Sequence, residues 1–96
     1  MFARVVSWEG ADPATLATML DEIRSQIAAG PMEGLPASGM LLLSDREAGR
    51  TMSIILFASE EDRRVGNETL NSMSPPVEGG LGRRRDVELF DVEVQV

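Results

Sequence analysis

The chain contains no histidine, cysteine, tyrosine or lysine, and all nine of its basic residues are arginine. The absence of histidine and cysteine excludes imidazole and thiolate metal ligands, a thiolate nucleophile and a serine–histidine relay. Without lysine there is no Schiff base, and without tyrosine there is no phenolic acid. Aspartate and glutamate are therefore the proton carriers that the sequence offers for catalysis, and serine and threonine are its nucleophiles.

Long apolar runs and a surplus of basic residues are also missing. No segment approaches the roughly 18 apolar residues that a membrane-spanning helix needs, and residues 2–8 read as a strand rather than as a signal peptide. The net charge of −7 disfavours nucleic acids and acidic membranes as partners, because both bind basic protein surfaces. We therefore expect a cytoplasmic protein that binds neither nucleic acid nor membrane.

Two helices are marked by their boundary residues. Asp12 is a good N-cap and Pro13 suits the first helical position, while Gly30 and Pro31 end this helix. A second helix begins at Ser59, because three acidic residues follow it at the positive end of the helix dipole, and it continues to about residue 73. The first helix carries apolar residues at helical spacing. They are Leu16, Met19, Leu20, Ile23 and Ile27.

Four segments read as strands because of their apolar and β-branched content. They span residues 2–8, 40–44, 51–57 and 87–96. Residues 45–50 form a hairpin turn between the second and third strands, where Gly49 can supply a positive φ. The order β-α-β-β-α-β predicts a single α+β domain over residues 1–96. Its expected fold is ferredoxin-like, with a four-stranded antiparallel sheet and two helices on one face.

The second and third strands indicate a dimer. Residues 40–43 and 54–57 are apolar at consecutive positions, so both faces of these strands are apolar. The two helices cover one face, and the other face would leave an exposed patch larger than monomers usually carry. A second copy of the same sheet is the simplest cover. We expect a homodimer that buries about 2,000 Å² or more in total.

Four short segments resemble the antibiotic-biosynthesis-monooxygenase-like (ABM) family of the dimeric α+β barrel superfamily. They are the opening strand Ala3–Trp8, the turn from Leu35 to Gly39, the hairpin at residues 45–50, and the stretch from Ile54 to Glu61. The resemblance covers nearly the whole chain and implies a dimeric α+β barrel. The family includes cofactor-independent quinone-forming monooxygenases, haem-degrading enzymes and many members of unknown role.

The chain departs from this family at positions that decide between those activities. The haem-degrading members ligate iron through a histidine of the second helix, and this chain has no histidine. Arg4 stands where those members have an asparagine, and Phe57 stands where the family often has tryptophan. We therefore expect no haem binding, because histidine, cysteine and tyrosine ligands are all missing. No other cofactor is expected.

Five residues are candidates for contact with a small apolar or aromatic ligand. They are Arg4, Trp8, Ser53, Phe57 and Asn67. Arg4 shares a strand face with Trp8 and can bind a carboxylate or enolate oxygen, with Ser53 or Asn67 as hydrogen-bond donors. The alternatives are an ion pair for Arg4, core packing for Trp8 and Phe57, and a solvent-facing position for Asn67.

The segment from residue 74 to residue 86 is a candidate flap, because it is rich in proline and glycine and poor in apolar residues. Arg83 and Arg85 at its end can clamp an anion, or they can tie the segment to acidic neighbours. The acidic residues 60–62 would suit a hard cation, but helix capping already explains them. We therefore expect no metal site.

Two functions fit these observations. The first is a small-molecule-binding homodimeric barrel with an apolar pocket between the sheet and the helices. The resemblance implies that its ligand is aromatic or polyketide-like. If the protein is catalytic, the resemblance implies a cofactor-independent monooxygenase, in which a bound phenol anion itself reacts with dioxygen. The alternative is a non-catalytic dimeric binding or accessory module.

Overall fold

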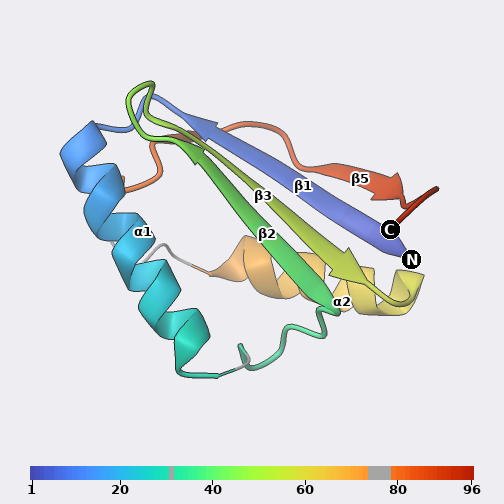
Figure 1. The fold of residues 1–96 in the computed structure, drawn as a ribbon. Coiled ribbons are helices and arrows are strands. Elements are labelled where there is room, and N and C mark those ends of the chain that lie inside the picture. The colour runs from blue at the N-terminus through green and yellow to red at the C-terminus, as the bar shows by residue number, and fades with distance from the viewer. Residues whose placement is uncertain (31, 74–78) are drawn as a thin grey trace.

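The computed structural model describes residues 1–30, 32–73 and 79–96. Its elements follow the predicted order, with one additional short strand (Figure 1). They are β1 (Phe2–Glu9), α1 (Pro13–Ala28), β2 (Gly39–Asp45), β3 (Arg50–Phe57), α2 (Glu60–Ser72), β4 (Arg83–Arg84) and β5 (Glu88–Asp91). Of the helices in the described ranges, none has the length and hydropathy that a bilayer span requires.

The strands form one antiparallel sheet in the order β2-β3-β1, and both β4 and β5 pair with the far edge of β1. β1 pairs with β3 from Phe2 opposite Phe57 to Trp8 opposite Thr51. Directly paired residues share a face of the sheet, so Arg4 and Trp8 lie on one face with Ile55. The predicted ferredoxin-like fold is confirmed.

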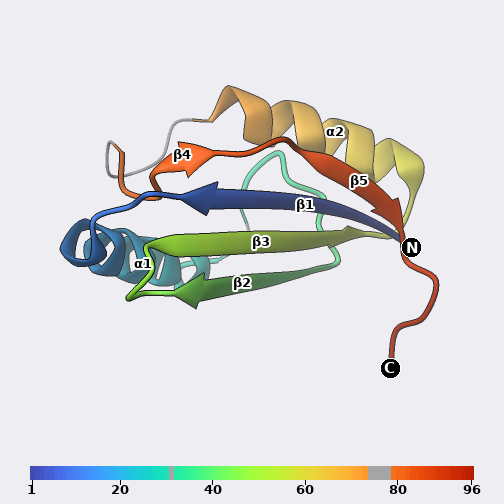
Figure 2. The same cartoon turned by 90° about the horizontal axis from the view of Figure 1, so that it is seen from above.

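Both helices lie on the same side of the sheet, which leaves the other side uncovered (Figures 1 and 2). The burial of β3 alternates in accordance with this arrangement. Ile55 and Phe57 face the helices and are 3% and 0% exposed, whereas Ile54 on the other face is only half-buried. Asp12 accepts a hydrogen bond from Thr15 N and Ser59 accepts one from Asp62 N, so both predicted N-caps are confirmed.

We call the side of the sheet away from the helices the open face. Its exposed large apolar side chains are Leu41, Leu43 and Phe90, which are 55%, 46% and 49% exposed. Leu41 pairs with Ile54 and Leu43 pairs with Met52, so these apolar side chains are contiguous across β2 and β3. This is the apolar second face that the sequence predicts.

The predicted last strand is wrong beyond residue 91. The sequence pattern extends it from residue 87 to residue 96, but β5 ends at Asp91. Asp91 pairs with Phe2, the first residue of β1, and Val92 N donates a last hydrogen bond to Met1 O. Beyond that point β1 offers no further residue as a partner. Val94 and Val96 are accordingly 82% and 119% exposed.

Gly66 allows α2 to approach the sheet. A Cβ atom at this position would lie 2.4 Å from Cε1 of Phe57. The glycine weakens the helix by about 1 kcal/mol relative to alanine, but it permits the contact that buries the Phe57 ring completely. Close packing against Phe57 therefore requires a glycine at this position, although glycine is a poor helix former.

We expect Gly66→Ala to destabilise the protein by about 1–3 kcal/mol, because overpacking outweighs the gain in helix propensity. Chemical denaturation followed by circular dichroism measures the change. Phe57→Leu should offset part of the loss, so the double variant should be less destabilised than the sum of the single variants. A stability gain in Gly66→Ala alone would contradict this packing argument.

Candidate functional site

An apolar cavity of about 340 Å³ lies between the sheet and the two helices, and we call it the inner cavity. The sheet contributes Arg4, Trp8 and Ser53 to its wall. Four of the six methionines of the chain also line it, and their flexible thioethers adapt well to aromatic ligands. They are Met19, Met32, Met40 and Met73.

The Arg4 side chain is buried in this wall, at 3% exposure. Its Nε donates to Asn67 Oδ1 at 2.9 Å, and its Nη2 donates to Asn71 Oδ1 at 3.0 Å. Both asparagines belong to α2, where their spacing of four residues places them on one side of the helix. The guanidinium is therefore held by neutral amide oxygens, and among the described residues it forms no ion pair.

Arg84 is a second cationic residue that lines the inner cavity and contacts Asn71. It pairs with Trp8 across β4 and β1, and its Nη2 donates to Asn71 Oδ1 at 3.0 Å. One amide oxygen thus accepts from two guanidinium groups. Burial lowers the pKa of Arg4, and the positive charge of Arg84 lowers it further. Arginine still remains charged at neutral pH.

This arrangement leaves positive charge in the wall of an apolar cavity without a matching acid. The protein carries seven more acidic than basic residues, yet none of the described residues that line the inner cavity is acidic. A buried charge is costly unless it is paired. An anionic group that enters the cavity would therefore gain a strong partner.

The sequence identifies the Arg83–Arg85 run but not Arg84 as its important member. Strand alternation separates the three residues, because neighbouring side chains of a strand point to opposite faces. Arg84 shares the helix-facing side with Trp8, while Arg83 lies opposite Glu9. The signal that identifies Arg84 is therefore its pairing with β1, which depends on tertiary structure.

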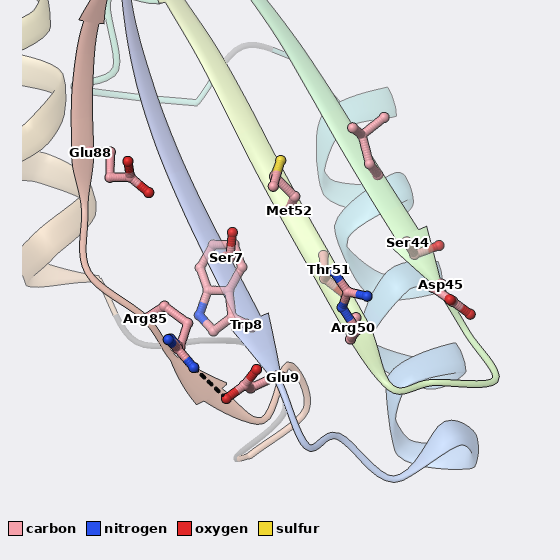
Figure 3. Close-up of a pocket in the computed structure, with 11 residues that line it drawn as sticks. Ser7, Trp8, Glu9, Ser44, Asp45, Arg50, Thr51, Met52, Arg85 and Glu88 are labelled. Carbon is pink, nitrogen blue, oxygen red and sulfur yellow. Dashed lines mark hydrogen bonds and ion pairs between the residues drawn. The ribbon is translucent and has the colours of Figure 1, made fainter.

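Arg83 and Arg85 form ion pairs with Glu9 at 2.6 and 2.7 Å. Their hydrogen bonds hold the pKa of the Glu9 carboxyl below its ordinary value. Arg85 and Glu9 line a second cavity, of about 510 Å³, on the open face. Figure 3 shows their ion pair among the residues that line this cavity. The acidic partner of these two arginines is thus part of the chain itself, as the alternative interpretation of the sequence predicts.

The predicted flap begins outside the described residues, which leave out residues 74–78. From Gly79 onward the chain makes a turn in which Gly82 N donates to Gly79 O at 3.0 Å. Leu81 is buried in this turn, and it packs in the same cluster as Leu16 and Met19. Gly80 and Gly82 serve close packing, because an added Cβ atom would lie 2.9 Å from Met19 Cβ and 2.3 Å from Glu9 O, respectively.

The remaining candidates fall into different environments. Trp8 packs against the core cluster and also lines the inner cavity, and Ser53 lines the cavity at 7% exposure. Asn67 contacts Arg4 from α2. Phe57 is fully buried beneath Gly66 and does not line the cavity. Within the described ranges, no group of three or more acidic side chains could hold a metal ion.

The fold can be compared with that of a known protein. A crystal structure of a monooxygenase from the gene ActVA-Orf6 of Streptomyces coelicolor, in complex with the ligand nanaomycin D, matches with a TM-score of 0.64 at 15% sequence identity. The match covers 99% of this chain and 89% of that chain. The chain has the fold of this monooxygenase. The match confirms the ferredoxin-like α+β fold of the single chain that the resemblance to the ABM family implies. No protein-family model matches the sequence, and no curated protein matches it.

Proposed function

We propose that the protein is a homodimer in which the inner cavity of each subunit binds a small aromatic molecule through one anionic oxygen. The observation that carries this proposal is the buried Arg4 guanidinium, which lines an apolar cavity without an acidic partner among the described residues. Arg84 adds a second positive charge, and the thioethers suit the flat faces of an aromatic ligand. The apolar open face supports the dimer.

The catalytic form of the proposal is oxygenation of a bound phenol. The phenol binds already ionised, or it loses its proton next to Arg4. The resulting anion then donates electrons to dioxygen. A phenol and dioxygen then give a quinone and water, with one oxygen atom of dioxygen incorporated into the quinone and the other released as water. Arg4 stabilises the phenolate, and the Ser53 hydroxyl of the cavity wall is a second donor. Asn67 does not line the cavity and acts by holding the Arg4 guanidinium through its Oδ1. The nanaomycin D ligand of the structurally similar monooxygenase is consistent with this substrate class.

A second candidate function is binding without catalysis. The wall of the inner cavity contains cationic, hydroxyl and apolar groups, and its described residues include no carboxylate that could accept a proton from a substrate. A binding module needs the anion site but no such base. Oxygen uptake with a hydroxylated naphthalene, measured against the rate without protein, separates the two functions.

Anion binding can be measured through Trp8, the single tryptophan of the chain, which lines the inner cavity and also the open-face cavity. The Arg4 variants then show which of the two spaces the anion occupies. A hydroxynaphthoquinone that is ionised at neutral pH should quench its fluorescence saturably, and the neutral parent naphthoquinone should bind at least tenfold more weakly. Arg4→Met should weaken binding of the anion about tenfold to a hundredfold, since a charge-assisted hydrogen bond contributes about 1.5–3 kcal/mol. Arg4→Lys should recover part of the loss.

The control variant is Arg64→Gln, because Arg64 lies on the exposed side of α2 and pairs with Glu61 and Glu68. It should bind the anion like the wild type. Circular dichroism establishes that each variant is folded. Equal affinity for the anionic and neutral quinones, or unchanged binding by folded Arg4→Met, would show that the cavity is not an anion site.

A further inference from the structure

A groove of about 310 Å³ lies beside the inner cavity, between α1 and the edge strand β2, and we call it the outer groove. Both spaces are lined by the same four apolar side chains of α1 and β2. These are Ile23, Ile27, Met40 and Leu42. The inner cavity and the outer groove thus share one row of lining side chains.

This row can open by side-chain rotation. Ile27 and Met40 are 44% and 39% exposed, so they are not locked by surrounding atoms. Methionine has three rotatable side-chain bonds and adapts readily to a neighbour. Rotation of these two side chains would join the inner cavity to the outer groove without moving a helix.

The outer groove also carries positive charge. Arg24 of α1, Arg46 of the β2–β3 turn and the Ser44 hydroxyl contribute its polar groups. Neither arginine takes part in an ion pair within the described part of the chain. In a protein with an excess of acidic residues, one pair of arginines therefore lines the inner cavity and another pair lines the outer groove, with the shared apolar row between the two spaces.

We propose that the ligand is elongated and carries a second acidic group. Its aromatic part and first anion occupy the inner cavity at Arg4, an apolar arm passes Ile27 and Met40, and the second acid binds Arg24 and Arg46. This inference rests on the proposed function, because it extends the same ligand. It narrows the ligand class from aromatic anions to aromatic molecules with an acidic side arm.

The two ends should contribute differently. In the inner cavity the ligand meets the buried Arg4 among mostly apolar side chains, where an ion pair is stronger, whereas Arg24 and Arg46 are exposed and screened by solvent. The second acid should therefore tighten binding about tenfold rather than determine whether the ligand binds. The apolar arm adds affinity through burial against Ile27 and Met40.

The test uses hydroxynaphthoquinones with alkyl arms of increasing length that end either in a carboxylate or in the matching amide. Trp8 fluorescence reports binding in the wild type, in the double variant Arg24→Met/Arg46→Met and in the control Arg64→Gln. We expect one arm length at which the carboxylate binds about tenfold more tightly than the amide. The double variant should lose this difference and retain wild-type affinity for the quinone without an arm.

The outcomes separate this inference from the proposed function. If the quinone without an arm fails to bind, the proposed anion site is wrong and the extended ligand fails with it. If that quinone binds but no arm length favours the carboxylate, the second subsite alone is overturned. A carboxylate preference that persists in the double variant would also overturn it, because the acid would then bind elsewhere.

Discussion

Ile55→Asp should leave the protein unable to fold. Ile55 is 3% exposed on the helix-facing side of β3, directly opposite Arg4 in β1 and Met40 in β2. A carboxylate there loses its hydration and the apolar contacts of the isoleucine side chain, and an ion pair with Arg4 repays only part of this cost. Burial of the charge and the lost packing together cost about 4 kcal/mol or more, which is most of the stability of a small domain. Circular dichroism should show no cooperative thermal transition.

The neighbouring Ile54→Asp is the matched comparison, because the same change is made one residue away on the open face. In a single subunit that carboxylate reaches water, so it costs the fold less than Ile55→Asp. In the proposed dimer it lies in the interface, so the variant should sediment as a monomer at micromolar concentration. The wild type should show a thermal midpoint that rises with protein concentration. An Ile54→Asp protein that remains dimeric would contradict the open-face interface.

Gly49→Ala should destabilise the protein by about 3 kcal/mol or more. The residue has φ of +67°, and a Cβ atom would lie 2.2 Å from the carbonyl oxygen of Ala11. Strain in the left-handed region costs about 1–3 kcal/mol, and the collision with backbone adds to it because backbone cannot rotate away as a side chain can. The Ala11 N donor to Gly49 O at 3.2 Å would be displaced as well.

Gly10→Ala isolates the first of these two costs. Gly10 has a similar φ of +78°, but its added Cβ would meet no atom within 4 Å. It should therefore lose only about 1 kcal/mol, from backbone strain. Urea unfolding of the two variants gives the difference directly. If both variants lose the same stability, close packing between the hairpin and the start of α1 contributes nothing measurable.

Local patterns in the sequence predict most of the fold. The capping residues Asp12 and Ser59 mark both helix starts, and strand alternation places Arg4 and Trp8 on one face before any contact is known. The pattern fails at the last strand, since residues 93–96 alternate like a strand but have no partner in β1. An alternating apolar and polar sequence shows that a segment can form a strand. The length of the neighbouring strand determines where the hydrogen-bonded pairing ends.

The candidate site is predictable only in part. Arg4 follows from its position in β1, but the lack of an acidic partner depends on which side chains α2 brings to it. Asn67 and Asn71 fill the places where an acid would have formed an ion pair. Phe57 lies on the helix-facing side of its strand, as the sequence predicts. It does not reach the cavity, because the glycine at position 66 lets α2 pack directly on the ring.

The distribution of methionines makes the protein well suited to methyl-selective nuclear magnetic resonance. Of the six methionines, four line the inner cavity, while Met52 lies on the open face and lines its cavity. Met1 remains at the start of β1, outside both spaces. A single sample labelled at the methionine methyl groups would thus carry separate signals for ligand occupancy and for subunit association. The two proposed events could then be followed independently, without any dye or engineered cysteine.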